Sequence, residues 1–244
     1  MDDLQIIELY FARDEHAIKE TDRKYGKLFL GKIDVPDMQE DIRTPIVYSK
    51  TLTRLRFVPD DGSQQTYIIN FASHSESLQG CNELVSADFP CYLREKILEE
   101  TGAETLYCVG AIGGMISMDI PDEQEIRKNG NDFSESTKRI GRQLADYALS
   151  IKEADEILLE SKIGSITQEV YFKAENSILL IAAKAGILKA KEFRFPDKSG
   201  FAMKSEISYF EIGSLKILML PCEIFPELVY GGYLSAEESA TGKG

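Results

Sequence analysis

Segments with the pattern of strands and segments with the pattern of helices alternate along the middle of the chain, and this order restricts the possible folds most. A polar-apolar alternation, the turn Pro59-Asp60-Asp61-Gly62 and a short apolar run predict a β-hairpin. The spacing of apolar residues after it predicts a helix, a strand and a second helix. The predicted segments are 52–58 and 67–71 for the hairpin, 90–101 and 134–151 for the helices, and 106–112 for the strand. We therefore expect an α/β or α+β fold, a single layered domain in which helices flank a mixed sheet.

The N-terminal part is predicted to differ from the rest. Residues 2–25 carry a stripe of apolar residues at helical spacing, which predicts an amphipathic helix that ends at Gly26. Residues 28–45 are expected to be irregular, because Pro36 and Pro45 interrupt them. We accordingly divide the chain into an N-terminal helix, 1–26, and a main domain, 27–244.

Strand signals return in the C-terminal third. Residues 165–172 alternate in polarity and predict a strand, whereas residues 178–188 fit a helix or a strand. Two more alternating segments, 206–212 and 215–220, flank the dipeptide Gly213-Ser214. A two-residue turn of this kind predicts a second hairpin.

Composition excludes several classes of function. The 244 residues carry a formal net charge of −13, which argues against a nucleic-acid binder and against attachment to an anionic membrane. No apolar run is long enough for a transmembrane helix, and the first residues do not form a signal peptide, so we expect a cytoplasmic protein from the sequence as written.

Histidine and cysteine limit the possible metal chemistry. The chain has only two histidines, His16 and His74, which excludes a site built from three histidines of one chain. Its four cysteines, Cys81, Cys91, Cys108 and Cys222, form no C-x-x-C pair. We expect them to be free, buried thiols.

Four places in the sequence could carry chemistry. His74 directly follows a predicted buried strand, a position where a scaffold can present a reactive group or a metal ligand; a hydrogen-bonded structural histidine is the alternative. Asp88 precedes a helix with Pro90 in its first turn, so it either caps that helix or orients a metal-bound histidine.

The other two places lie near the end of predicted strands. Gly113 and Gly114 could let the backbone approach a ligand closely, or could form a tight turn. Glu223 follows an apolar strand and has apolar neighbours, so its carboxylate is expected to be paired, metal-bound or protonated. Glu227 is expected to be an exposed residue at the start of a helix.

From about residue 28 to residue 233, the chain resembles the catalytic domain of the neutral/alkaline non-lysosomal ceramidase family, in particular its short bacterial members. The matching segments occur in the same order: 52–57, 70–74, 84–90, the glycine-ended strand 106–114, and 220–223. The resemblance implies an amidohydrolase that uses one zinc ion against the amide bond of a lipid-like N-acyl substrate.

The resemblance assigns roles to individual residues. His74 matches a family zinc-binding histidine, and Glu223 matches the glutamate ligand of the Pro-Gly-Glu motif, with Cys222 in place of glycine. Asp88 would orient the metal-bound histidine, Gly113 and Gly114 would line the substrate site, and Ser117 lies one place from the position of the family serine.

Other parts of the family pattern are absent from this sequence. Its earlier His-Thr-His segment has no counterpart, and its tyrosine ligand lies beyond the end of this chain. Since catalytic zinc usually has three protein ligands, two nominated ligands leave the site incomplete. The first hypothesis is therefore a zinc-dependent amidohydrolase of the ceramidase type, inactive if the missing ligands are not replaced, and the second is a non-catalytic globular remnant.

Residues 1–26 resemble a different family. Asp3 to Gly26 is similar to the first helix of extracytoplasmic-function sigma factors. This resemblance implies a third hypothesis, a regulatory protein whose N-terminal helix contacts a polymerase subunit. The net charge and the absence of DNA-contacting helices weigh against it.

Overall fold

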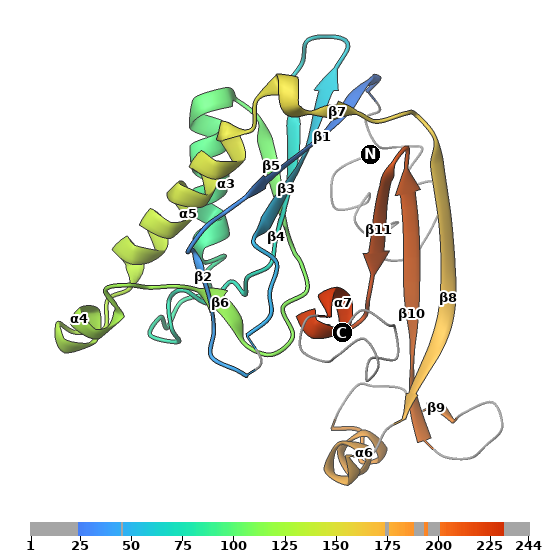
Figure 1. Cartoon of the computed structure of the whole chain (residues 1–244). Coiled ribbons are helices and arrows are strands. Elements are labelled where there is room, and N and C mark those ends of the chain that lie inside the picture. Colours follow the sequence, from blue (N-terminus) through green and yellow to red (C-terminus); the bar gives the residue numbers. More distant parts are fainter. Residues whose placement is uncertain (1–23, 45, 174–175, 188–192, 195–200, 232–244) are drawn as a thin grey trace.

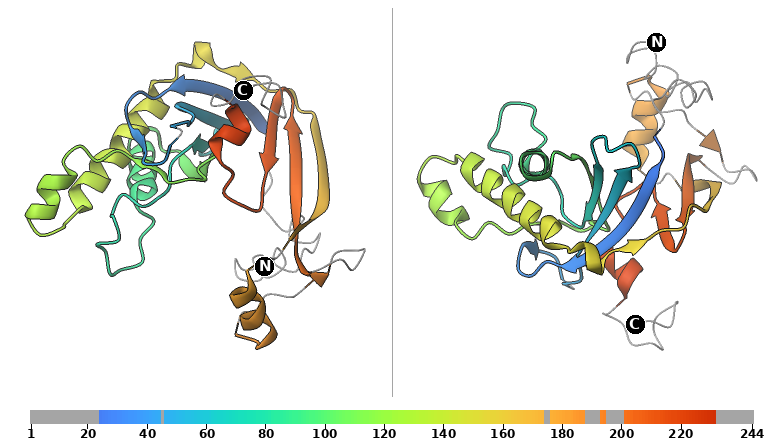
Figure 2. Two further views of the ribbon diagram at one scale, coloured as in Figure 1. Left: turned by 60° about the horizontal axis from the view of Figure 1, so that its bottom comes forward. Right: turned by 90° about the horizontal axis from the view of Figure 1, so that it is seen from above.

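The computed structural model describes residues 24–44, 46–173, 176–187, 193–194 and 201–231, and this part of the chain is built in layers (Figure 1). Helices α3 (Phe89–Thr101) and α5 (Ser134–Ser150) cover one face of a five-stranded sheet, here called the main sheet. A second sheet lies on its other side, as the view from above also shows (Figure 2). The predicted fold class, a mixed sheet with flanking helices, is confirmed.

The main sheet has the strand order β5-β4-β3-β1-β7. Its strands are β1 (Gly26–Asp34), β3 (Thr51–Pro59), β4 (Thr66–Phe71), β5 (Glu104–Val109) and β7 (Ile157–Leu158). Strands β4 and β5 run parallel and the other neighbours run antiparallel. The predicted hairpin is the β3–β4 pair, and the predicted strand 106–112 and helices 90–101 and 134–151 correspond to β5, α3 and α5.

The prediction of irregular structure over residues 28–45 was wrong. Strand β1 pairs with all nine residues of β3, and a short strand, β2 (Gln39–Asp41), pairs with β6 (Ile116–Met118). Pro36 lies between β1 and β2, so it separates two strands without preventing either. At Gly26, the first residue of β1, a Cβ atom would lie 2.4 Å from the Val58 carbonyl oxygen, so this position requires glycine.

Both faces of the main sheet are covered, and a separate apolar cluster lies on each. On the helix face, the strands contribute Leu52, Tyr67, Ile69 and Phe71 to a core shared with α3 and α5. On the opposite face, buried Leu30, Leu55 and Leu159 contact side chains of the second sheet, Ile212 and Leu215 among them. The two clusters fix the main sheet as the central layer.

Two arginines of β3 are buried on the helix face, where they share one carboxylate. Arg54 and Arg56 both donate hydrogen bonds to Glu156, whose side chain is completely buried. Burial raises the pKa of Glu156, but the hydrogen bonds from Arg56 and Arg54 outweigh it, and its pKa lies below the usual value. Arg54 also donates to the carbonyl oxygens of Ala148 and Ile151 at 2.6 and 2.9 Å, so the cluster ties the end of α5 to the sheet.

The second sheet has the order β11-β10-β8, with β9 (Phe193–Arg194) paired to one end of β10. Its main strands are β8 (Ile163–Lys173), β10 (Phe201–Ile212) and β11 (Leu215–Met219), all antiparallel. The strand predicted over 165–172 and the hairpin predicted around Gly213-Ser214 are confirmed. Residues 177–184 form helix α6 (Ser177–Lys184), which decides between the two structures that the sequence allowed there.

Three remaining expectations have different outcomes. All four cysteines are free as predicted, but three of them are exposed and Cys91 is half-buried, so the expectation of buried thiols was wrong. Among the described helices, none is long and apolar enough to cross a membrane. The amphipathic helix predicted over 2–25, together with His16, lies almost entirely outside the described residues.

Candidate functional site

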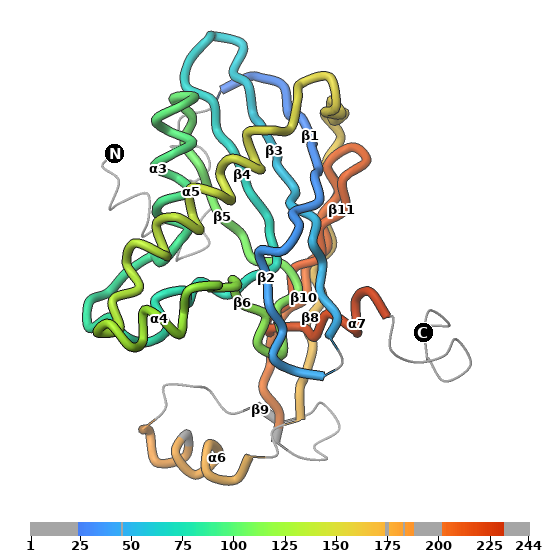
Figure 3. Tube along the Cα trace, turned by 60° about the vertical axis from the view of Figure 1, so that its left-hand side comes forward, coloured from blue at the N-terminus to red at the C-terminus, as the bar shows by residue number. Residues whose placement is uncertain are grey.

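The candidate site lies where the parallel strands β4 and β5 end. His74 follows β4 by three residues, and Gly113, Gly114 and Ser117 follow β5 in the turn that leads into β6 and in β6 itself. The strands β2 and β6 and helix α7 (Pro226–Tyr230) gather at this same end of the main sheet (Figure 3). Side chains from distant parts of the sequence therefore meet there, as is common where parallel strands end.

His74 is held at both ring nitrogens. Its Nδ1 lies 2.8 Å from the Ile116 carbonyl oxygen and its Nε2 lies 3.1 Å from Glu223 Oε2. A carbonyl oxygen only accepts hydrogen bonds, so Nδ1 carries a hydrogen, and the contact with the Glu223 carboxylate is attractive when Nε2 carries one too. Burial lowers the pKa of His74, but the bonds to Ile116 and Glu223 outweigh it and raise the pKa above its usual value. The pair is therefore a hydrogen-bonded ion pair when His74 is protonated.

A second carboxylate lies on the other side of the imidazole. Glu76 Oε1 is 4.0 Å from His74 Nδ1, and it accepts a short hydrogen bond from the hydroxyl of Ser117. Ser117 is 9 % exposed and its hydroxyl donates to Glu76 and not to His74, so this arrangement is not that of a serine nucleophile activated by histidine.

The glycine turn holds the segment that carries Glu223. Gly113 N–H donates to the Ile224 carbonyl oxygen at 2.9 Å, and a Cβ at Gly113 would lie 2.7 Å from the Glu223 carbonyl oxygen. Gly114 has φ +101° and leaves room for the Arg43 side chain, 2.2 Å from where its Cβ would be. Because Gly113 and Gly114 have no side chain, residues 223–224 and the Arg43 side chain can approach the backbone of this turn. The role of the two glycines in substrate binding stays a prediction.

Arg43 and Glu227 form a bidentate ion pair beside this turn. Both guanidinium NH groups lie 2.7 Å from the carboxylate oxygens, and the guanidinium also lies 4.8 Å from the centre of the Phe225 ring. The Glu227 side chain is only 9 % exposed, so the expectation of an exposed helix-start residue was wrong, although Glu227 does lie in the first turn of α7. Hydrogen bonds from Arg43 hold the pKa of Glu227 below its usual value.

Replacing Arg43 by glutamine is expected to lower the free energy of unfolding at neutral pH by about 1–3 kcal/mol, because Glu227 would lose its partner. A carboxyl group whose pKa is lower in the folded state stabilises the fold above its unfolded pKa, here near 4.5, and this stabilisation is lost as the pH falls through the folded value. Urea unfolding from pH 7 to pH 3 should therefore show the difference from wild type narrowing below about pH 4.5.

Lys50→Gln is the matched control, because its ion pair with Asp37 is 3.8 Å long and exposed. It is expected to change stability by less than about 0.5 kcal/mol at any pH. A difference between Arg43→Gln and wild type that stays constant down to pH 3 would contradict a role for the Glu227 carboxylate.

Asp88 organises the loop after His74, and its hydrogen-bond partners are in residues 77, 78 and 89. Its carboxylate accepts hydrogen bonds from the Ser77 and Leu78 N–H groups at 2.9 and 3.0 Å, from the Ser77 hydroxyl, and from Phe89 N–H at 2.8 Å. It is the N-cap of α3, as one of the two predictions for it requires. Any effect on His74 is exerted through the backbone of residues 77–78.

The described residues do not complete a catalytic zinc site. His74 Nε2 and Glu223 Oε2 are chemically suitable zinc donors, and their separation of 3.1 Å is close to that of two ligands on one tetrahedral zinc ion. Within residues 24–44, 46–173, 176–187, 193–194 and 201–231, no three His, Cys, Asp or Glu side chains are grouped so that they could hold a metal ion. The donor set therefore does not fit the three protein ligands that a catalytic zinc ion usually has.

Sequence reasoning did not identify Glu76 or Arg43 as parts of the site. Glu76 is two residues from His74, and this proximity is the only signal that could have suggested it. Arg43 lies 184 residues from Glu227, in a segment that was predicted to be irregular, and nothing local indicates the pairing.

Comparison with known proteins supports the fold. No family model and no curated protein matches the chain. Among solved structures, a neutral ceramidase from Pseudomonas aeruginosa is similar with a TM-score of 0.58 and 17 % identity, over 82 % of this chain and 40 % of that one. A ceramidase complexed with C2 is similar with a TM-score of 0.58 and 16 % identity, over 82 % of this chain and 42 % of that one.

The identities and coverages limit how much of the resemblance to ceramidases is supported. The chain spans about two fifths of the length of these two ceramidases. The resemblance of residues 1–26 to sigma factors has no support in the comparisons. At this level of identity the similarity concerns the fold, and the described part of this chain therefore has a ceramidase-like fold.

Proposed function

We propose that this chain is a non-hydrolytic protein of ceramidase-like fold that binds a lipid-like N-acyl amide. One observation carries the non-hydrolytic part: beside His74 and Glu223, the described residues supply no third side chain that could complete a zinc site. A zinc ion that activates water is usually held by three protein ligands, one more than His74 and Glu223 provide.

Exposed apolar side chains next to the site support a lipid-like ligand. Ile42, Met115, Phe225 and Leu228, here called the apolar rim, are 72, 52, 45 and 64 % exposed. They lie within one or two residues of Arg43, Gly114, Glu223 or Glu227, which the contacts described above bring together. Exposed apolar side chains on segments that lie close together are a common feature of binding surfaces. The amide class of the ligand is supported by the ceramidase-like fold.

A zinc-dependent amide hydrolase is the second candidate, and one observation favours it. The Ile116 carbonyl oxygen fixes Nδ1 of His74 and directs Nε2 toward a carboxylate, an arrangement that is also common for metal-binding histidines. A third ligand would then have to come from outside the described residues.

The two candidates differ in metal content and turnover of the full chain. After purification with zinc present, we expect well under one zinc ion per chain and no release of fatty acid from a fluorogenic ceramide. Stoichiometric zinc and turnover, both lost in His74→Ala, would instead establish the hydrolase.

Binding is tested separately by titrating the chain into a fluorescent short-chain N-acyl amide. We expect saturable binding that Met115→Ser weakens by about tenfold, since burial of a methionine side chain is worth about 1.5 kcal/mol or more. Met219→Ser is the matched control, because Met219 is 47 % exposed but lies on the second sheet, and this variant should bind normally. Absence of saturable binding, or equal effects of both variants, would overturn the proposed ligand site.

A further inference from the structure

We propose that two copies of this chain associate by antiparallel pairing of their β8 strands, which joins their second sheets into one continuous sheet. Strand β8 is at the edge of the order β11-β10-β8, and among the described residues no other strand pairs with its outer side. It is the outermost strand of the second sheet in Figures 1 and 2. Its first seven residues, 163–169, are all exposed. Within the described part of the chain, the outer backbone N–H and C=O groups of residues 163–169 are thus available to another strand.

Strand β8 lacks the features that usually protect a sheet edge. It is 11 residues long and pairs with β10 residue by residue from Ile163 to Lys173, with no bulge in the register. It contains no proline, and its charged residues are only Glu169 and Lys173. Edge strands of natural proteins are generally short, bulged, or interrupted by proline or inward charge. The other edge strands, β11 and β7, have five and two residues, and β5 has six.

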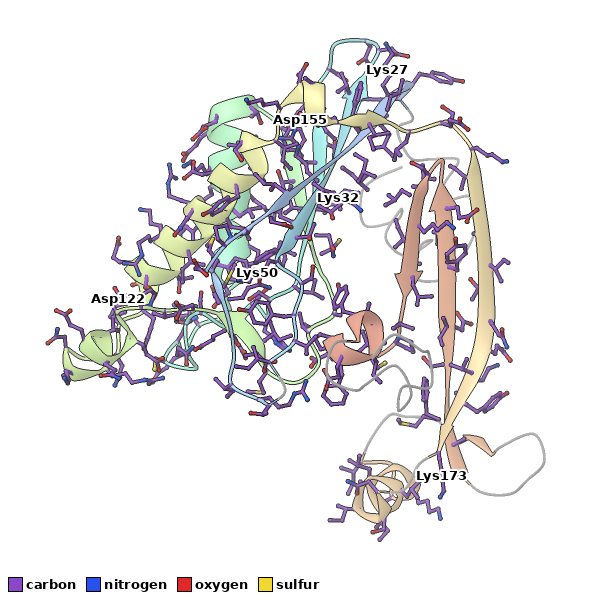
Figure 4. All side chains as sticks on the ribbon, in the orientation of Figure 1. Lys27, Lys32, Lys50, Asp122, Asp155 and Lys173 are labelled. Carbon is purple, nitrogen blue, oxygen red and sulfur yellow. The ribbon has the colours of Figure 1, made fainter. Side chains whose placement is uncertain are left out.

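The sequence of β8 is compatible with pairing to itself. A two-fold axis at Gln168 is the register that pairs all 11 residues, because Gln168 is the central residue of the strand. It places Ile166 opposite Val170 and Thr167 opposite Glu169, and it brings no like charges into opposition. Moving the axis by one residue to Glu169 would place two carboxylates opposite each other, which is destabilising. Lys173, at the far end of the strand beside α6 (Figure 4), would lie opposite Ile163.

The outer face of the second sheet supports the same arrangement. Directly paired residues of β8, β10 and β11 lie on the same side of the sheet. Ile212 and Leu215 lie on the side that faces the main sheet, and the opposite, outer side is mainly apolar. Its members include Ile166, Met203 and Leu218, which are 70, 59 and 58 % exposed. In the paired arrangement Ile166 and Val170 of each copy extend this apolar row across the dimer axis. A second copy of β8 would continue both the backbone ladder and the row of apolar side chains.

The oligomeric state of the full chain tests this inference. Sedimentation equilibrium up to about 0.1 mM, where an interface with a Kd of about 10 µM is mostly dimeric, should give twice the chain mass of 27.4 kDa. Because each copy carries a net charge of −13, the dimer should become tighter as salt is added.

Charge exchange at the two-fold axis identifies the interface. Gln168→Lys and Gln168→Glu should each weaken the dimer several-fold, because like charges then meet at the axis, and an equimolar mixture of the two should recover wild-type affinity or better. Leu218→Lys, on the same face but at the opposite edge strand, should leave the dimer unchanged.

Three results would overturn the inference. These are a wild-type monomer at the highest concentration, a Gln168→Lys variant that dimerises as tightly as the wild type, and loss of the dimer in Leu218→Lys alone. The recovery in the mixture distinguishes a broken interface from a misfolded variant, since misfolded chains would not recover on mixing.

Discussion

Glu156→Gln is expected to lower the free energy of unfolding by about 3–5 kcal/mol, the usual cost of removing one partner from a buried ion pair. The Glu156 side chain is completely buried, and its carboxylate is shared by Arg54 and Arg56, whose terminal nitrogens lie 2.8 and 2.5 Å from it. Glutamine keeps the size of the side chain but removes the charge, so two nearly buried guanidinium groups would be left without their common counter-charge. Chemical denaturation at pH 7 measures the loss.

Glu153→Gln is the matched control, because Glu153 also pairs with Arg56, at 3.2 Å, but its side chain is 83 % exposed. An exposed ion pair contributes at most about 1 kcal/mol, so this variant should be close to wild type. Equal losses in the two variants would show that the burial of Glu156 is not what makes its charge important.

Asp88→Ala is expected to cost about 3 kcal/mol or more, because four donors would lose their acceptor in a buried place. Asp88 is 4 % exposed and accepts from three backbone N–H groups and one hydroxyl. Each buried donor left unsatisfied costs about 1–3 kcal/mol. Thermal and chemical denaturation both measure the effect.

Asp88→Gly distinguishes the contribution of the Asp88 side chain to stability from the cost of its backbone conformation. Asp88 has φ 57° and ψ −153°, a conformation that is strained for any residue other than glycine. Glycine would lose the same hydrogen bonds but relieve the strain, so Asp88→Gly should be more stable than Asp88→Ala by about 1 kcal/mol. The reverse order would show that the backbone at position 88 is not strained.

Asp37→Ala is the control for a general effect of removing aspartate at positive φ. Asp37 has φ 51°, but its side chain is 91 % exposed and its ion pair is long. Asp37→Ala should lower the free energy of unfolding by less than about 1 kcal/mol. A loss comparable with that of Asp88→Ala would mean that the hydrogen bonds of Asp88 are not the cause.

Local signals in the sequence were sufficient for the elements whose boundaries depend on nearby residues. Asp88, Pro90 and Gly102 mark the two ends of α3, and the structure places a cap, a first-turn proline and a left-handed glycine there. The turn at Gly213-Ser214 likewise predicted the β10–β11 hairpin, because such turns depend on two residues only.

Elements that depend on distant partners could not be predicted in this way. Strand β1 contains two glycines and is defined by its pairing with β3, not by its own pattern. The alternation of β3 was visible in the sequence, but arginine usually marks the side of a strand that faces solvent. Here Arg54 and Arg56 lie on the helix face, because they pair with Glu156, about 100 residues further along the chain.

The candidate site shows the same division. Its position after β4 was predictable from the strand and His74, while the contact between His74 and Glu223, 149 residues apart, was suggested only by the resemblance to ceramidases. Their roles as zinc ligands, and those of Asp88, Ser117, Gly113 and Gly114, stay predictions. The carboxylate of Glu76 and the Arg43–Glu227 pair depend on how β2, β6 and α7 come together, which no short segment encodes.

The stability of the wild-type chain and of His74→Ala, each measured with excess zinc and with a chelator, tests the central claim that His74 and Glu223 pair with each other and do not share a metal. A metal that binds only the folded state must stabilise it, by about 2.7 kcal/mol at a hundredfold excess over its Kd. We predict that zinc and chelator give the same free energy of unfolding for the wild type, and that His74→Ala lowers it equally in both. Stabilisation by zinc in the wild type that disappears in His74→Ala would contradict the account.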